Sequence, residues 1–265
     1  MVQRVMRISL ACCALAIGLS AAASQAQYAD LEGQIILDGD IPAMKNKVEK
    51  GDPTAKDAAV CAAETIPYYN LTINPENKGV ADVFVYIRKA AKVNPDLAKV
   101  PSEPLVIDQK HCQFIPEAMI VRTGQQVIAK SEDAVPHNIH GYNVFNPGFN
   151  FTVPANDREG QKVPIDKANK KAEPLPIAVK CDIHTHMESY WLVIDHPYAA
   201  VTDKDGKFKI AGLPEGKHTL TIWHNTAGYL AKTLNVEVKK GGTTMEPLKV
   251  KTEKSGDVAK LLPLK

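Results

Sequence analysis

Residues 181–187 read Cys-Asp-Ile-His-Thr-His-Met and place a thiol, an imidazole and a thioether at three-residue intervals. A tight loop between two strands can fold three side chains with this spacing around a single ion. The candidate ligands in this stretch are Cys181, His184 and Met187. Because a thiolate and an imidazole together suit a soft or borderline metal, the stretch predicts part of a mononuclear metal site.

A second stretch of sequence supplies the missing ligand. Residues 135–140 read Val-Pro-His-Asn-Ile-His and lie on an expected strand upstream of the loop. His137 completes a set of two imidazoles, one thiolate and one weak thioether, which is the donor set of a blue copper site. Asn138 is expected to hydrogen-bond the backbone beside Cys181 and so hold the two stretches together. An isolated histidine is usually an ordinary polar side chain, and this interpretation is kept for His111, His196, His218 and His224.

Together the two stretches carry a family resemblance. Residues 104–196 resemble a cupredoxin, with the Pro-His-Asn-x-His run and the Cys-x2-His-x2-Met loop of the amicyanin type. The resemblance implies one copper ion whose ligands are His137, Cys181, His184 and Met187. The loop departs from the family pattern because Thr185 stands where a proline is common and His186 where an aromatic residue is common. Whether His186 or His140 perturbs the copper is left open by the sequence.

A second module lies on both sides of this segment. Residues 200–220 contain an Asp-x-Asp-Gly turn, a strand, a Leu-Pro-x-Gly turn and another strand, and resemble a carboxypeptidase regulatory-like, transthyretin-type β-sandwich. Such modules usually begin with Gly-x-Val and continue with a run like Gly-Val-x-x-Val-x-Val. Similar pieces occur here before the copper segment, at residues 33–35 and 79–85.

The expected organisation is therefore a discontinuous regulatory-like sandwich, residues 27–102 and 197–252, with a copper domain of residues 103–196 inserted into it. Exposed loops tolerate such insertions when the termini of the inserted domain lie close together. Residues 253–265 are expected to form a C-terminal tail. The combined architecture resembles periplasmic methylamine-utilisation-like proteins, but likeness of fold does not identify a substrate.

The N-terminus has the pattern of a secretory signal peptide, expected to cover residues 1–26. Arg4 and Arg7 precede a run of apolar and small residues, and Ser24 and Ala26 offer the small side chains that a signal peptidase reads. The alternative is a membrane anchor, but the apolar run is short for a bilayer and ends in small and polar residues. We therefore expect a periplasmic or secreted protein with no transmembrane segment after signal cleavage.

Cleavage of the signal changes the cysteine count. Of five cysteines, Cys12 and Cys13 lie in the signal, which leaves Cys61, Cys112 and Cys181. Disulfides persist in an oxidising compartment, and an odd count leaves one thiol for another purpose. The economical assignment is a Cys61–Cys112 disulfide with Cys181 on the metal, and the alternative is three free, buried thiols.

The mature chain is expected to be all-β: a Greek-key cupredoxin sandwich and a second, transthyretin-like sandwich. Short runs of apolar residues recur between Gly, Pro and Asp turns, a pattern typical of β-sandwiches. Residues 44–60 are charged and aperiodic and are interpreted as a loop, and residues 88–104 as a linker or short helix. The net charge of +2 gives no reason to expect a nucleic-acid partner.

The most economical function is a one-electron carrier that serves a redox partner protein in the periplasm or on the membrane surface. In the family, the histidine ligand that the loop contributes is exposed at an apolar patch, so the resemblance implies that His184 is the route for electrons. A copper chaperone or storage protein is the second hypothesis, and a non-metal β-sandwich interaction module is the third. An enzyme is the weakest hypothesis, because no paired carboxylates, Gly-x-Ser-x-Gly or phosphate loop is recognisable.

Overall fold

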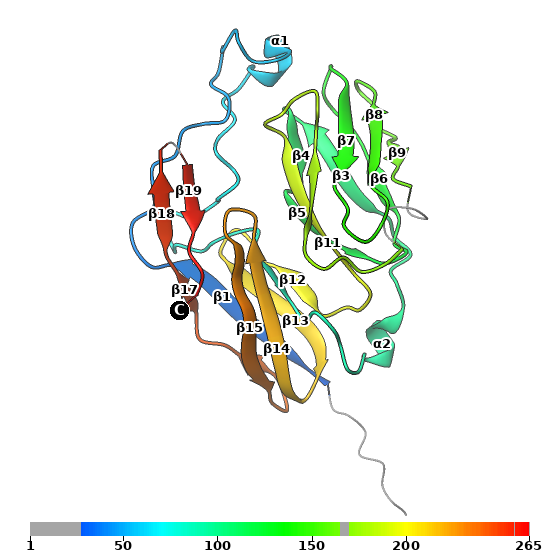
Figure 1. The fold of residues 1–265 in the computed structure, drawn as a ribbon, viewed down its shortest axis with the longest axis vertical. Helices are drawn as coiled ribbons and strands as arrows, with labels where there is room; N and C mark the ends of the chain where they lie inside the picture. Colours follow the sequence, from blue (N-terminus) through cyan, green and yellow to red (C-terminus); the bar gives the residue numbers. More distant parts are fainter. Residues whose placement is uncertain (1–27, 165–169, 257, 265) are drawn as a thin grey trace, which may run out of the picture.

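The computed structural model describes residues 28–164, 170–256 and 258–264, and the expectation of an all-β protein is confirmed (Figure 1). Two helices, each a single turn, interrupt the strands: α1 (Ala58–Cys61) and α2 (Pro95–Ala98). Within the described ranges, neither helix approaches the length and apolar character that a membrane span requires. The proposed signal peptide, residues 1–26, lies outside the described residues.

Two sheets form the first sandwich. One has the strand order β5-β11-β10-β7-β8 and the other the order β4-β3-β6-β9. Their facing side chains form one apolar core, which includes Phe114, Ile139 and Trp191. The strands are β3 (Leu105–Lys110), β4 (Gln113–Ile115), β5 (Ala118–Arg122), β6 (Val127–Ala129), β7 (His137–Gly141), β8 (Phe149–Val153), β9 (Gln161–Lys162), β10 (Ile177–Lys180) and β11 (Glu188–Ile194).

The second sandwich is built from strands that precede and follow the first in sequence. β1 pairs with β13, β16 and β17, and β2 lies between β12 and β14 in a sheet that ends in β15. In β13 the alternating residues Phe208 and Ile210 are buried, as expected for a strand with one face on a core. The strands are β1 (Tyr28–Leu37), β2 (Phe84–Tyr86), β12 (Ala199–Val201), β13 (Lys207–Pro214), β14 (Gly216–His224), β15 (Gly228–Val238), β16 (Thr243–Thr244) and β17 (Leu248–Val250).

Strands from both sides of the first sandwich in sequence thus pair within the second, and the insertion of one domain into another stays a proposal. Two segments pack differently from the expected organisation. Residues 48–69, assigned by sequence to the regulatory-like sandwich, contribute buried side chains to the core of the first sandwich. The expected tail, residues 253–265, is instead largely occupied by a hairpin of β18 (Thr252–Ser255) and β19 (Val258–Leu261). Ala259 and Leu261 of that hairpin are buried in the core of the second sandwich, so apolar burial orders the C-terminal segment.

Strand β11 joins the two sandwiches because it is buried on both faces. Trp191 and Val193 point into the core of the first sandwich, whereas Leu192 and Ile194 belong to a separate apolar cluster. That second cluster also contains Phe84, Tyr86 and Trp223 from the other sandwich. The two-residue period of a strand explains this division, because successive side chains point to opposite faces.

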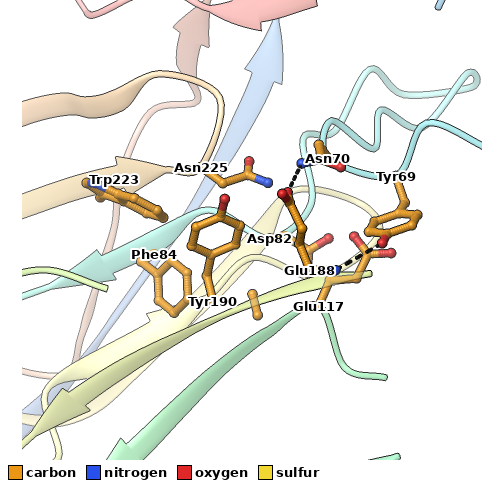
Figure 2. A pocket seen from close by; sticks show the side chains of 10 residues that line it. Tyr69, Asn70, Asp82, Phe84, Glu117, Glu188, Tyr190, Trp223 and Asn225 are labelled. Carbon is orange, nitrogen blue, oxygen red and sulfur yellow. Dashed lines mark hydrogen bonds between the residues drawn. The ribbon is translucent and has the colours of Figure 1, made fainter. Parts of the chain in front are cut away.

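A group of carboxylates lies at the junction of the sandwiches, around a cavity of about 10 Å³ (Figure 2). Glu188 is well paired there: its carboxylate accepts hydrogen bonds from Asn70 Nδ2 at 2.7 Å and from Lys180 Nζ at 3.0 Å. Glu117 is not so favourably placed. Burial and the nearby Asp82 raise the pKa of Glu117 to about 9, so this carboxyl is protonated at neutral pH.

We expect Glu117→Gln to stabilise the protein at pH 8. Because the pKa of Glu117 is raised in the folded protein, its favourable contribution to the free energy of unfolding is complete below its ordinary pKa of 4.5. This contribution is lost as the pH rises toward 9. Glutamine cannot ionise, so the variant should gain about 1 kcal/mol in the free energy of unfolding at pH 8, and less at pH 5. Urea unfolding at both values measures the difference.

Glu188→Gln is the matched control with the opposite sign. Burial works to raise the pKa of Glu188, but the hydrogen bond with Lys180 and the charge of Lys47 outweigh it and leave the pKa lowered. The charged form is therefore the stabilising one, so this variant should lose stability at pH 8. Equal effects of the two substitutions would contradict the assigned protonation states.

Candidate metal centre

The loop between β10 and β11 is closed by its own backbone and by the Cys181 sulfur. Cys181 N donates to Met187 O at 3.3 Å, and Met187 N donates to His184 O at 2.9 Å. His184 N also points at Cys181 Sγ, at 3.4 Å. These contacts turn the side chains of Cys181, His184 and Met187 inward, as the three-residue spacing predicts.

The loop meets His137 of β7 in the interior of the first sandwich. His137 Nδ1 lies 3.0 Å from His184 Nδ1, and Cys181 Sγ lies 4.0 Å from His137 Nδ1 and 3.8 Å from His184 Nδ1. All three residues are buried, and their ligand atoms lie within 4.8 Å of one another. Met187 is fully buried in the same apolar core as Cys181. The structure thus brings together His137, Cys181 and His184, with Met187 on the same loop.

The arrangement favours a thiolate at Cys181. Burial alone would raise the pKa of Cys181, but hydrogen bonds with His137 and His184 outweigh burial and bring the pKa down to about 6. Burial similarly opposes protonation of His137, yet Asp133 and the Cys181 thiolate raise the pKa of this imidazole to about 9. A cation bound among the three side chains would displace the shared proton and take over the attraction for the thiolate.

Asp133 fixes the orientation of the first histidine. Its Oδ2 lies 2.8 Å from His137 Nε2, so His137 Nδ1 is the nitrogen directed at the cluster. The same carboxylate accepts the backbone N–H groups of His111 at 2.7 Å and Cys112 at 2.9 Å. A carboxylate that binds the second nitrogen of a histidine holds the ring in place and increases the basicity of the ligand nitrogen.

Asp57 fixes the orientation of His184 in the same way. Asp57 Oδ2 lies 2.9 Å from His184 Nε2. Asp57 occupies the N-cap position of α1, where an aspartate normally accepts a backbone N–H, but its side chain makes no capping bond. Its backbone is also left-handed, with φ of 52°. The Asp57 side chain therefore binds His184 and leaves the first N–H groups of α1 without a side-chain cap.

The residues around Asp57 cover the loop of residues 181–187, and we call residues 46–69 the covering segment. Lys47 Nζ and Tyr69 OH both donate to His186 O, at 2.9 and 2.5 Å. The His184 side chain has no exposed surface. The expectation that His184 is exposed and passes electrons directly to a partner is therefore wrong, because the covering segment closes this edge.

The predicted disulfide is present and anchors the covering segment. Cys61 and Cys112 are bonded to each other, and Cys181 is free and buried. The two bonded cysteines lie close to the histidines: Cys112 beside Asp133 and His137, and both beside His184. Because their sulfurs are oxidised, they offer no thiolate, and Cys181 supplies the thiolate of the cluster.

The two additional histidines have other partners. His186 Nε2 lies 3.0 Å from the carbonyl oxygen of Cys112, so this ring faces the disulfide. His140 Nδ1 lies 3.0 Å from Asp182 Oδ2. The hydrogen-bonding nitrogens of both side chains are therefore directed away from the cluster, although the His186 ring lies edge-on to the His184 ring, with centroids 6.3 Å apart.

Asn138 has the expected role. Its side-chain oxygen accepts the backbone N–H of Asp182 at 2.6 Å and of Ile183 at 3.3 Å. Strand β7 and the loop of residues 181–187 are consequently fixed to each other next to His137 and Cys181.

The sequence did not indicate Asp57 or Asp133. Asp133 lies four residues before His137, but this spacing has no special meaning outside a helix. Asp57 is distant in sequence from its partner and belongs to a stretch interpreted as a loop. The one indication was the density of charged residues in a segment tied down by Cys61.

Comparisons with known proteins give only distant structural likenesses. No protein-family model and no curated protein matches the chain. A copper-containing nitrite reductase from Thermus scotoductus is 18% identical over 39% of this chain and 27% of its own length, with a TM-score of 0.28. Amicyanin from Paracoccus versutus is 13% identical over 41% of this chain and 95% of its own, with a TM-score of 0.26. Likenesses this weak decide neither fold nor function, which rest on the geometry above.

Proposed function

We propose that this protein holds one copper ion and carries single electrons. The observation that supports this most directly is the convergence of His137 Nδ1, Cys181 Sγ and His184 Nδ1 in a buried position. Two imidazoles and a thiolate, with a thioether as weak fourth ligand, form the donor set that accommodates both Cu(II) and Cu(I). Met187 is the residue proposed for the fourth position.

The donor set fits copper better than the alternatives. A structural zinc site usually has four strong ligands, and a hard cation requires oxygen ligands. Here the carboxylates of Asp57 and Asp133 bind the outer nitrogens of the two histidines instead of facing the cluster. Copper, when bound, supplies a one-electron couple.

The protein's own contribution is rigidity. Asp57, Asp133 and Asn138 fix the two imidazoles and the loop, so the ligands need little rearrangement when the charge of the site changes by one. Four protein ligands also leave no open position for a substrate. This favours an electron carrier over an enzyme.

We further propose an exported protein that acts in the periplasm or outside the cell. The support is the signal-like N-terminus and the Cys61–Cys112 disulfide, since disulfides persist in oxidising compartments. The proposed partner is another redox protein in the same compartment or on the membrane surface.

The proposal is tested by loading the mature chain with copper. One copper per chain is expected, with a strong visible absorption band from the thiolate and an electron paramagnetic resonance spectrum in the oxidised state. A loaded protein without the visible band would indicate storage or transport of copper rather than electron transfer. A chain that binds no copper would refute the metal site.

Asp57→Ala should loosen the metal without removing a ligand. The variant takes away the carboxylate that orients His184, and loss of such a partner costs roughly 10–100-fold in metal affinity. A chelator should therefore extract copper at least about tenfold faster. Glu64→Ala, at an exposed position of the covering segment, is the matched control and should behave as the unmodified protein. Equal extraction rates for both variants would contradict the role of Asp57.

A further inference from the structure

Closure of the His184 edge raises the question of where electrons leave the site. The residue that follows Cys181 is Asp182, whose side chain is 45% exposed. Its carboxylate accepts hydrogen bonds from Asn138 and Asn150 and lies 3.0 Å from His140 Nδ1. One peptide unit therefore separates the thiolate residue from a surface network.

That network ends in an exposed aromatic ring. Tyr142 OH donates to Asp182 Oδ1 at 3.4 Å, and the rings of His140 and Tyr142 are stacked with their centroids 4.1 Å apart. His140 lies on the outer side of β7, whose inner side presents the ligand His137, and Tyr142 directly follows the strand. Cys181 thus connects to this surface through the peptide unit to Asp182, and His137 through its neighbour Asn138, which donates to the Asp182 carboxylate.

The surface beyond Tyr142 is apolar and held in place. Tyr142, Val144 and Phe145, which we call the loop patch, are 47%, 58% and 60% exposed. The buried carboxylate of Glu173 accepts the backbone N–H groups of Val144 at 3.0 Å and Phe145 at 2.8 Å. A rigid loop that exposes two large apolar side chains beside an aromatic ring has the composition of an interface centre.

On the side of Phe145 the loop patch borders two cations. Phe145 lines a groove of about 580 Å³ together with Arg88 and Lys89 of the second sandwich. Within the described part of the chain, neither cation makes an ion pair or a side-chain hydrogen bond. Glu173, also at this groove, is occupied by backbone N–H groups. The groove therefore presents two exposed cations without an ion-pair partner next to the apolar patch, whereas the Glu173 carboxylate is buried.

We propose that the loop patch, with Arg88 and Lys89, is the docking and electron-exchange surface for a redox protein with an apolar contact area rimmed by carboxylates. The proposal rests on the copper function proposed above. Complementary charge steers such partners together and sets the rate of encounter more than the final affinity. Electrons would then leave the site from Cys181 through Asp182, and not through the His184 edge.

Charge reversal tests the location. Reduced, copper-loaded protein is mixed with hexacyanoferrate(III), an anionic oxidant, and return of the visible band is followed by stopped flow. One electron passes from the protein to the oxidant, which becomes hexacyanoferrate(II), and no proton or atom is transferred. The double variant Arg88→Glu/Lys89→Glu should react about tenfold more slowly at low salt, and the difference should shrink as salt rises.

Two other double variants with the same change in net charge are the controls. Lys239→Glu/Lys240→Glu lies at the exposed turn after β15 and outside the lining of the groove, and Lys50→Glu/Lys56→Glu lies on the covering segment beside His184. Both should react nearly as fast as the unmodified protein. With tris(phenanthroline)cobalt(III), a cationic oxidant, Arg88→Glu/Lys89→Glu should react faster than the unmodified protein.

The outcomes separate this inference from the function on which it rests. Suppose that the visible band is normal and the oxidation rate falls most in Lys50→Glu/Lys56→Glu. Electron exchange would then take place at the His184 edge, and only this inference would be overturned. Equal slowing in all three double variants would also overturn it, because only total charge would then matter. Absence of the band in the unmodified protein would remove the copper function and the inference together.

Discussion

Replacing Cys181 with serine is expected to abolish the visible band and most of the copper affinity. Cys181 provides the free thiol of the described chain and the sulfur that contacts both His137 and His184. A thiolate forms the short, covalent bond to copper that produces the charge-transfer band, and a serine hydroxyl cannot replace it. Absorption spectra and metal analysis of the loaded variant measure both losses.

Two substitutions on the same loop serve as comparisons. Met187→Leu keeps the buried volume and removes the weak ligand, so it should mainly shift the redox potential and leave the band. His186→Phe should leave the spectrum nearly unchanged, because His186 Nε2 contacts the carbonyl of Cys112. A Cys181→Ser protein that keeps its colour and its copper would overturn the site.

Removal of the disulfide is expected to have the largest effect on stability. The Cys61–Cys112 bond links residues 51 positions apart in sequence. Closing a loop of this length restricts the unfolded chain by an entropy worth about 4 kcal/mol. The double variant Cys61→Ala/Cys112→Ala should therefore unfold at a clearly lower temperature, as measured by calorimetry under oxidising conditions.

The same variant should also weaken the metal site. The covering segment carries Asp57 to His184, and the bonded Cys112 donates its N–H to Asp133, the partner of His137. Copper should therefore be extracted more easily than from the unmodified chain. A disulfide-free protein with unchanged unfolding temperature and unchanged copper retention would show that the covering segment is held by its other contacts alone.

The parts of the structure that the sequence predicted are those with a local pattern. The loop of residues 181–187 carries its ligands at a spacing that one hairpin can close, and the strand of His137 was recognisable from its neighbours. The pairing of Cys61 with Cys112 followed from counting. Each of these inferences needs only adjacent residues or a small number of candidates.

The missed features depend on contacts between distant segments. Asp57 reaches His184 across 127 positions, and nothing near Asp57 distinguishes it from a capping residue. The exposure of His184 was inferred from the family, but exposure depends on what packs above a residue. Strand β16 was also missed, because its two threonines have no pattern of their own and are ordered by pairing with β1. Strand β8 was missed although Phe-Asn-Phe-Thr-Val alternates apolar and polar residues as a strand should.

The burial of β11 on both faces makes the two sandwiches poor candidates for separation. A fragment limited to the first sandwich would present Leu192 and Ile194 to water, and one limited to the second would uncover Phe84, Tyr86 and Trp223. Each fragment would thereby expose an apolar surface that favours aggregation. The first sandwich is thus not a unit that recombination could move intact into another gene, and the two sandwiches are expected to have been inherited together.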